Sequence, residues 1–392
     1  MEPASILKAI KRCLPNEPGS PVSLHQPSFS GKEWEYVKEC LDSGWVSSVG
    51  KYVDEFEERL QVTTGAKYAV AVMNGTAALH LCLQLCGVEG DDEVLAPALA
   101  FVAVANAISY CNAVPHFVDS EERTLGLDPA SLESYLQQFS EIKNGECFNK
   151  SSGRRIKALI AVHTFGHPVN LDAVSTVCQR FKLELVEDAA ESLGSTYKGK
   201  HTGCWGKVSA LSFNGNKIIT TGGGGAILTQ DEGLARQARH LSTTAKQSHS
   251  WQYFHDAKGY NYRLPNINAA LGCAQLEQLS GFVQQKRELS TRYKNEFDNC
   301  SGIKFYQEPE FARSNYWLNV LILDEECSHH LEAILNLCNK EGVMTRPAWS
   351  LLNELPMFAS CPQAKLPVAE SLVKRILNIP SSAILGASNV QA

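Results

Sequence analysis

Several features are missing from this 392-residue sequence, and each absence excludes a class of protein. No apolar run approaches the roughly 20 residues that a membrane-spanning helix needs. No basic stripe suited to nucleic acid is present, because acidic and basic residues are mixed and the formal net charge is −6. The N-terminal segment carries Lys8, Lys11 and Arg12 but lacks the apolar core of a signal peptide. We therefore expect a cytoplasmic protein that binds neither membranes nor nucleic acid.

The cysteines form no metal-binding or redox pattern. The sequence has 13 of them, but no two are spaced as C-x-x-C, so neither a zinc ribbon nor a dithiol redox motif is predicted. Most lie in apolar segments, where cysteine behaves as a small hydrophobic residue. A disulfide framework is not expected in a chain of this size, which indicates a reducing compartment. We predict no metal site.

Short apolar runs alternate with helical patterns between residues 68 and 188. This alternation predicts an α/β fold in which helices cover both faces of a mostly parallel sheet. The expected strands are 68–72, 93–96, 114–118, 156–162 and 184–187, and the expected helices are 77–86, 101–110, 129–139 and 171–181.

The chain is long enough for two hydrophobic cores, because 44% of its residues are hydrophobic. We expect an N-terminal arm (1–20), a large ligand-binding domain (21–255) and a smaller C-terminal α/β domain (256–392). The polar stretch 141–155 is predicted to be a surface loop. Asn266 is predicted to cap a long helix that reaches about residue 293.

Three strand ends carry residues that suit a binding site. Asn74, Pro97 and Asp188 each follow or close a predicted strand. In open parallel sheets, ligands bind outside the carboxyl ends of the strands, so we expect these residues to gather at one edge.

The turn that begins with Asn74, Gly75 and Thr76 joins a strand to a helix. Free backbone N–H groups and the positive end of the helix dipole favour a phosphate at such a turn. Ser212, at the end of another predicted strand, is placed to reach the same phosphate. An ordinary Asn-Gly turn and an ordinary strand serine are the competing interpretations.

Asp188 closes a buried strand, and a buried carboxylate needs a partner. One candidate partner is an internal hydrogen bond or a helix N-terminus. The other is the N–H of a pyridinium ring. At about 4 Å and an effective dielectric near 20, the second pairing is worth roughly 4 kcal/mol. That energy raises the pKa of a pyridine nitrogen by about three units and keeps the ring ready to accept electrons.

Lys217 lies in a polar turn between two apolar runs, and four glycines (222–225) follow it. Such a turn predicts a nucleophilic lysine held in place to form an imine with an aldehyde cofactor. A solvated hairpin lysine is the alternative. Phe101, which follows Pro97 in the next loop, is placed either to stack on an aromatic cofactor or to fill the core.

These segments occur in an order that resembles a known family. The matching segments are 74–79, 97–101, 186–190, 212–213, 217 and 259–263. The set looks like the DegT/StrS-type sugar aminotransferases, which are pyridoxal-phosphate enzymes of fold type I. The resemblance covers nearly the whole chain, from about residue 24 to about residue 380. The variant around Lys217, together with 45–48 and 345–349, is most similar to the LegC-type branch, which aminates UDP-linked 4-keto-6-deoxy-N-acetylhexosamines.

The resemblance implies a role for each matching residue. Lys217 would carry the covalent link to pyridoxal 5′-phosphate and move the proton, and Asp188 would pair with the pyridine nitrogen. Phe101 would stack on the ring. The remaining cofactor contacts implied are phosphate contacts from Gly75, Thr76 and Ser212, and a contact from Asn261 to the phosphate of the neighbouring subunit of a homodimer.

Three further positions are predicted to belong to the site. Glu191 stands where relatives often have Gln or His beside the 3-hydroxyl of the cofactor, so it must be protonated or paired with a cation. Arg346 and Trp349 are expected to touch substrate by analogy alone; for Arg346 an exposed structural residue is the alternative.

The predicted reaction moves an amino group from an amino acid, with glutamate expected, to C4 of a nucleotide-linked keto sugar in two half-reactions that share one site. Two alternatives stay open: a sugar dehydratase or deoxygenase of the same fold, and a catalytically silent binding subunit. The retained Lys217 and Asp188 favour the aminotransferase.

Overall fold

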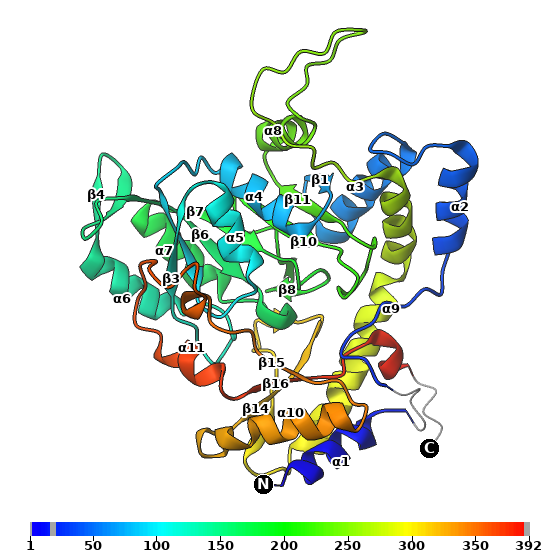
Figure 1. Cartoon of the computed structure of the whole chain (residues 1–392), viewed down its shortest axis with the longest axis vertical. Helices are drawn as coiled ribbons and strands as arrows, with labels where there is room; N and C mark the ends of the chain where they lie inside the picture. Colours follow the sequence, from blue (N-terminus) through cyan, green and yellow to red (C-terminus); the bar gives the residue numbers. More distant parts are fainter. Residues whose placement is uncertain (1, 16–20, 388–392) are drawn as a thin grey trace.

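The computed structural model describes residues 2–15 and 21–387, and these form two main sheets joined by one long helix (Figure 1). The described strands are β1 (Tyr68–Val72), β2 (Glu93–Pro97), β3 (Val114–Val118), β4 (Ser140–Lys143), β5 (Glu146–Asn149), β6 (Arg155–Val162), β7 (Glu184–Asp188), β8 (Thr196–Tyr197), β9 (Lys200–His201), β10 (Val208–Ser212), β11 (Gly225–Thr229), β12 (Ile303–Phe305), β13 (Ala312–Arg313), β14 (Asn319–Leu323), β15 (Arg346–Pro347) and β16 (Ile376–Ile379). The described α-helices are α1 (Pro3–Cys13), α2 (Glu33–Ser43), α3 (Lys51–Thr64), α4 (Gly75–Leu85), α5 (Ala103–Tyr110), α6 (Pro129–Phe139), α7 (Leu171–Phe181), α8 (Glu232–Ser242), α9 (Asn266–Phe297), α10 (Leu331–Lys340) and α11 (Pro367–Leu372).

Seven strands of the large sheet follow the order β1-β11-β10-β7-β6-β2-β3, and along this path all are parallel except β11, which runs antiparallel to both neighbours. Side chains alternate between its faces: Ala158 and Ile160 pack with α4 and α5, whereas Leu159 and Ala161 pack with α6 and α7. Burial on both faces explains why these strands read as continuous apolar runs. The predicted α/β fold is therefore confirmed.

The stretch 141–155 was predicted to be a loop, and that prediction is wrong. Its first half forms the hairpin β4–β5, and β5 pairs with the start of β6, so the segment extends the large sheet. Asn144 and Gly145 make the turn with φ values of 53° and 82°. Both positive values match a type I′ hairpin turn, which favours Asn-Gly. The turn signal was therefore present, but the polar flanking residues hid the strands.

A second, four-stranded sheet has the order β12-β14-β16-β15. It shares a core with α1, α10 and the C-terminal half of α9. The predicted N-terminal arm thus contains a helix whose apolar side, including Ile6 and Ile10, is buried in this core. The expected division of the chain at residues 20 and 255 remains a prediction. None of the described helices is long and apolar enough to cross a membrane.

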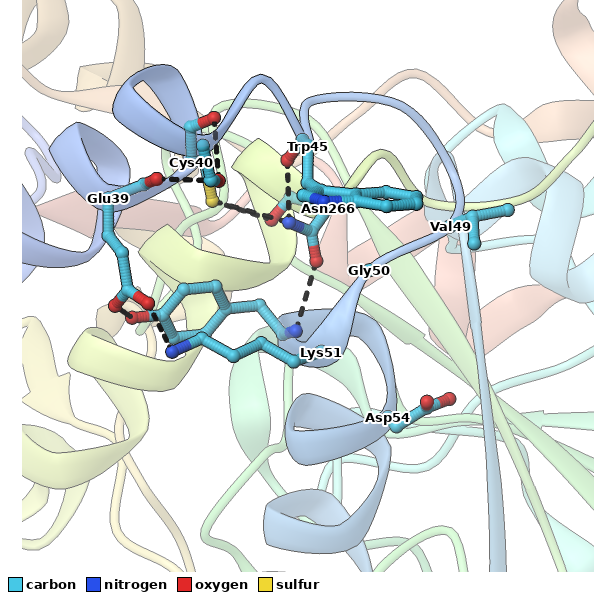
Figure 2. A pocket seen from close by; sticks show the side chains of 10 residues that line it. Glu39, Cys40, Trp45, Val49, Gly50, Lys51, Asp54 and Asn266 are labelled. Atoms are coloured by element: carbon cyan, nitrogen blue, oxygen red, sulfur yellow. Dashed lines mark hydrogen bonds and ion pairs between the residues drawn. The ribbon is translucent and has the colours of Figure 1, made fainter.

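Helix α9 has 32 residues and confirms the predicted long helix, but Asn266 is not its N-cap. Pro265 holds that position. The Asn266 amide instead accepts the backbone N–H of Tyr52 at 3.0 Å and donates to the carbonyl of Trp45 at 2.7 Å (Figure 2). Gly50, the N-cap of α3, has no side chain to satisfy that helix's first turn. Asn266 therefore caps α3 from another helix.

Replacing Asn266 with alanine is expected to destabilise the fold. The change leaves a buried N–H and a carbonyl without partners, which costs about 2–3 kcal/mol. We expect the thermal midpoint to fall by several degrees, measured by circular dichroism. Asn299→Ala, at an exposed position with no side-chain hydrogen bond among the described residues, should leave the midpoint unchanged. Equal midpoints for both variants would contradict the assignment.

Candidate active site

The turn after β1 brings the start of α4 against the end of β10. Asn74 caps α4 by accepting the N–H of Ala77 on its side-chain oxygen at 2.8 Å. A Cβ added to Gly75 would lie 2.8 Å from the Cβ of Ser212, so glycine is needed for this approach. The result places Gly75, Thr76 and Ser212 together at the positive end of a helix.

Gly225 also allows the start of α4 to lie close to the end of β10. It lies opposite Val72 of β1 and Ser212 of β10 in the sheet register. A Cβ there would lie 2.5 Å from the carbonyl carbon of Asn74 and 2.8 Å from the nitrogen of Gly75. Of the glycines after Lys217, Gly225 is therefore the one that the backbone contacts at this turn require.

Asp188 and Glu187 end the same strand but face opposite sides. Glu187 is fully buried and accepts three backbone N–H groups, from Gly203, Trp205 and Gly206, besides a contact to His163. Burial alone would raise its pKa, but these hydrogen bonds hold the pKa below the usual value. Glu187 is therefore a satisfied structural carboxylate.

Asp188 has fewer partners and lines the cavity. One of its oxygens accepts the N–H of Ala190 at 3.0 Å. Burial raises the pKa of Asp188, although this N–H and the nearby charge of Lys217 oppose the rise. The other oxygen makes no hydrogen bond with the described residues, so it is available to a ligand.

The loop that carries Lys217 is fixed at both ends. Backbone N–H groups of Phe213 and Thr221 donate to Gly224 and Phe213, and the N–H of Lys217 donates to Asn214 at 3.0 Å. The amine of Lys217 lies 3.4 Å from a carboxylate oxygen of Glu191 and 3.9 Å from the ring centre of Trp317. Its side chain is 13% exposed, so the amine is sheltered but can still be reached.

Of the two arrangements expected for Glu191, the structure has the ion pair with a cation, which is Lys217. The second carboxylate oxygen of Glu191 accepts the backbone N–H of Phe165 at 2.8 Å. Burial raises the pKa of Glu191, and the charge of Lys217 opposes this effect. Phe165 has a φ of 56°, an unusual value for a bulky residue, and this conformation directs its N–H to the carboxylate.

One cavity of about 340 Å³ collects most of the predicted site. The predicted residues that line it are Gly75, Thr76, Phe101, Asp188, Glu191, Ser212, Lys217 and Trp349. A larger cavity of about 420 Å³, beside α2 and α3 (Figure 2), holds none of them.

Two predicted residues do not line this cavity. Arg346, on β15, is exposed and donates to Asn339 and to the carbonyl of Thr345. Asn261 is also exposed, on a segment held by a bridge to Thr243. A single copy of the chain therefore gives neither residue a place in the site.

Trp317 and Asn216 line the cavity but were not predicted. Asn216 directly precedes Lys217, so its position could have been inferred from the turn. Trp317 stands in an apolar run that reads as an ordinary strand, and its contact with the lysine joins distant parts of the chain. No local pattern distinguishes it.

Residues 27–392 match the DegT/DnrJ/EryC1/StrS aminotransferase family. The chain is 39% identical over 360 residues to a GDP-perosamine synthase of Escherichia coli O157:H7, with 92% of this chain and 93% of the relative covered. It is also 39% identical to a putative pyridoxal phosphate-dependent aminotransferase, EpsN, of Bacillus subtilis, covering 92% and 90% of the two chains. Its fold matches the crystal structure of the aminotransferase TlmJ from Streptoalloteichus hindustanus with a TM-score of 0.84 and 27% identity, covering 95% and 96%.

A match over nearly the whole chain places the protein among the fold-type I aminotransferases. It belongs to the DegT/DnrJ/EryC1/StrS aminotransferase family. The predicted family, enzyme class and pyridoxal-phosphate cofactor are thereby confirmed.

Gly225→Ala is expected to weaken cofactor binding, because a methyl group there must push the Asn74–Gly75 turn away from Ser212. We expect the Kd for pyridoxal phosphate to rise about tenfold or more, a loss of about 1.4 kcal/mol, measured by titration of the apoenzyme. Gly223→Ala is the matched control, because a Cβ there meets no atom within 4 Å. A Gly225 variant with wild-type affinity would show that this close approach does not shape the site.

Proposed function

We propose that the protein transfers an amino group from an amino acid, with glutamate as the expected donor, to C4 of a nucleotide-linked 4-keto-6-deoxy sugar. The observation that carries this proposal is the convergence of Lys217, Asp188 and the Gly75–Ser212 contact on one cavity. When bound, pyridoxal phosphate supplies an electron sink for a carbanion at the reacting carbon.

The residues of the cavity fit this cofactor. The close approach of Gly75 and Ser212 leaves backbone N–H groups at the start of α4 open to a phosphate. The free oxygen of Asp188 suits a ring N–H, and the raised pKa that burial gives this carboxyl is offset once a cationic ring lies beside it. Lys217 supplies the amine that an aldehyde needs.

The side chains of the cavity have separate roles in the proposed reaction. Lys217 holds and moves the proton at the reacting carbon, and Glu191 is the charged partner next to its amine. Phe101 and Trp349, with ring centres 6.1 Å apart, form an aromatic wall that limits water and orients a flat ligand. Trp349 itself is held by stacking on Phe165 at 4.9 Å.

Two nucleotide-linked sugars are candidates for the substrate. A relative with 39% identity is named as a GDP-perosamine synthase, which favours a GDP-linked substrate. The UDP-linked N-acetylhexosamine of the LegC-type branch remains the prediction from sequence. Both substrates present a ketone at C4 of a nucleotide-linked sugar, so the same cavity chemistry serves either.

We also propose that the active form is a homodimer in which Asn261 acts on the neighbouring copy. The segment that carries Asn261 is held in place, because the N–H of Met73 donates to the carbonyl of Tyr262 at 2.7 Å. Asn261 is nevertheless exposed and makes no side-chain hydrogen bond among the described residues. A second copy is the partner that would give it a role.

The function is tested by a spectral titration. The pyridoxamine form of the enzyme is mixed with GDP-, UDP- and TDP-linked 4-keto-6-deoxy sugars, and the return of the visible cofactor band is scored. We expect the band to return with at least one sugar, and GDP- or UDP-linked sugars to be distinguished by rate. Lys217→Ala should show no return and no cofactor fixed by borohydride. Full turnover by that variant would overturn the proposal.

Mixing two inactive variants tests the shared site. Lys217→Ala and Asn261→Ala are each expected to be nearly inactive. If Asn261 serves the neighbouring copy, subunit exchange in a 1:1 mixture restores about a quarter of wild-type activity, because half of the dimers then contain one intact site of two. In the control mixture, Lys217→Ala is combined with Asn299→Ala instead of Asn261→Ala. The absence of any gain on mixing, with exchange confirmed by mass spectrometry, would place Asn261 in its own subunit's site or outside it.

A further inference from the structure

Two groups from different parts of the fold contact the amine of Lys217. The Glu191 carboxylate follows β7, and the Trp317 ring lies just before β14 of the second sheet. The distances are 3.4 Å to the carboxylate oxygen and 3.9 Å to the ring centre. Both residues are at least nine-tenths buried, so water competes little for the amine. An ion pair and a cation–π contact favour a positively charged amine in such a place.

Trp317 is held in this position by its own hydrogen bonds. Its indole N–H donates to the carbonyl of Asn216 at 2.7 Å, in the turn that carries Lys217. Its backbone carbonyl accepts from the amine of Lys286 at 3.1 Å, and its backbone N–H donates to the side chain of Asn315 at 2.8 Å. Turning the ring away therefore breaks the indole hydrogen bond, and the two backbone contacts hold the residue itself in place.

Asn315 connects the two partners of the lysine. Its fully buried amide accepts from the backbone of Trp317 and donates to the carbonyls of Glu191 and Leu193, both at 2.9 Å. One side chain thus ties together the backbones of the two residues that contact the amine. Lys286 adds a second anchor, because it is fully buried and, among the described residues, bonds only to carbonyls, of Trp317 and Ser381.

We propose that Glu191 and Trp317 form a holding site for the Lys217 amine whenever it carries no covalent bond to the cofactor, which makes Trp317 a further catalytic residue. The inference rests on the proposed function, since an aminotransferase must release its lysine and take it back in each cycle. Ordering a free lysine side chain costs conformational entropy, and a fixed charged partner and ring face offset that cost.

Other charged and titratable groups near the amine are Asp188, across the cavity, and His25. The His25 ring is buried beside Lys217 and Lys286, and burial with these two positive charges lowers its pKa well below the usual value. A neutral His25 does not repel the lysine. The negative and aromatic contacts of Glu191 and Trp317 are therefore the ones that favour the charged amine at close range.

The holding site is tested on the apoenzyme, without reference to turnover. Lys217 is labelled with isotopic acetic anhydride, and its peptide is quantified by mass spectrometry at about pH 7 and about pH 10.5. The ratio of the two values rises when the charged form of the amine is destabilised, because only the neutral amine reacts. It rises less than the neutral fraction at pH 7 does, because about half of an ordinary lysine is already neutral at about pH 10.5. Trp317→Leu keeps an apolar side chain but removes the ring face, and we expect the ratio to rise about twofold or more. Glu191→Gln should raise it in the same direction.

Trp205→Leu is the matched control, because that half-buried indole lies outside the cavity and its N–H has no hydrogen-bond partner among residues 2–15 and 21–387. Its ratio should equal that of the wild type. A role for Trp317 in packing alone would change access to the lysine at both pH values and leave the ratio unchanged, which overturns the proposal. Should Trp317→Leu fail to fold, Trp317→Phe, which keeps a smaller ring, is expected to give a smaller rise of about 1.5-fold, and a wild-type ratio there would overturn the proposal equally.

Failure of the proposed function gives a different result. If borohydride does not fix pyridoxal phosphate to Lys217 in the wild-type enzyme, the aminotransferase assignment of this lysine fails, whatever the labelling ratios are. If fixation succeeds but the ratio does not respond to Trp317 or Glu191, only the holding site fails.

Discussion

The site depends on the close packing of three backbone segments at Gly225. Strand β11 separates β1 from β10, and Gly225 lies opposite Val72 on one side and Ser212 on the other. With no side chain between them, the start of α4 lies directly on the end of β10. The parallel pairing of β7 with β10 brings Asp188 to the same edge, because Asp188 lies opposite Ala210 in the sheet register. The phosphate-binding turn and the buried carboxylate thus reach one cavity from separate parts of the chain.

Two neighbouring carboxylates at the end of β7 have different roles. Glu187 is buried, and its carboxylate accepts hydrogen bonds from three backbone N–H groups. Asp188 keeps one oxygen free and faces the cavity. Strand geometry alone separates them, because successive side chains point to opposite faces. A carboxylate pair in the sequence therefore yields one structural residue and one residue available to a ligand.

The sequence predicted the parts of the site that depend on local order. Gly75, Asp188 and Ser212 stand at strand ends, and the rule that ligands bind at the carboxyl edge of a parallel sheet is enough to place them together. The role of Asn266 escaped prediction because its partner, Tyr52, is 214 residues away. The role of Trp317 could not be predicted for the same reason, because its indole bonds to a residue 101 positions earlier. The β4–β5 hairpin escaped because its strands are polar, although its Asn-Gly turn was visible.

Helix α9 has a mechanical consequence for the enzyme. Its N-terminal half packs with α3 against one face of the large sheet, and its C-terminal half shares the core of the second sheet (Figure 1). At 32 residues it is a continuous rod of about 48 Å, and such helices bend only gently. The helix therefore fixes the two cores relative to each other. Lys286 lies about two-thirds of the way along α9 and bonds to the Trp317 carbonyl, so the position of the helix and the surroundings of Lys217 are linked.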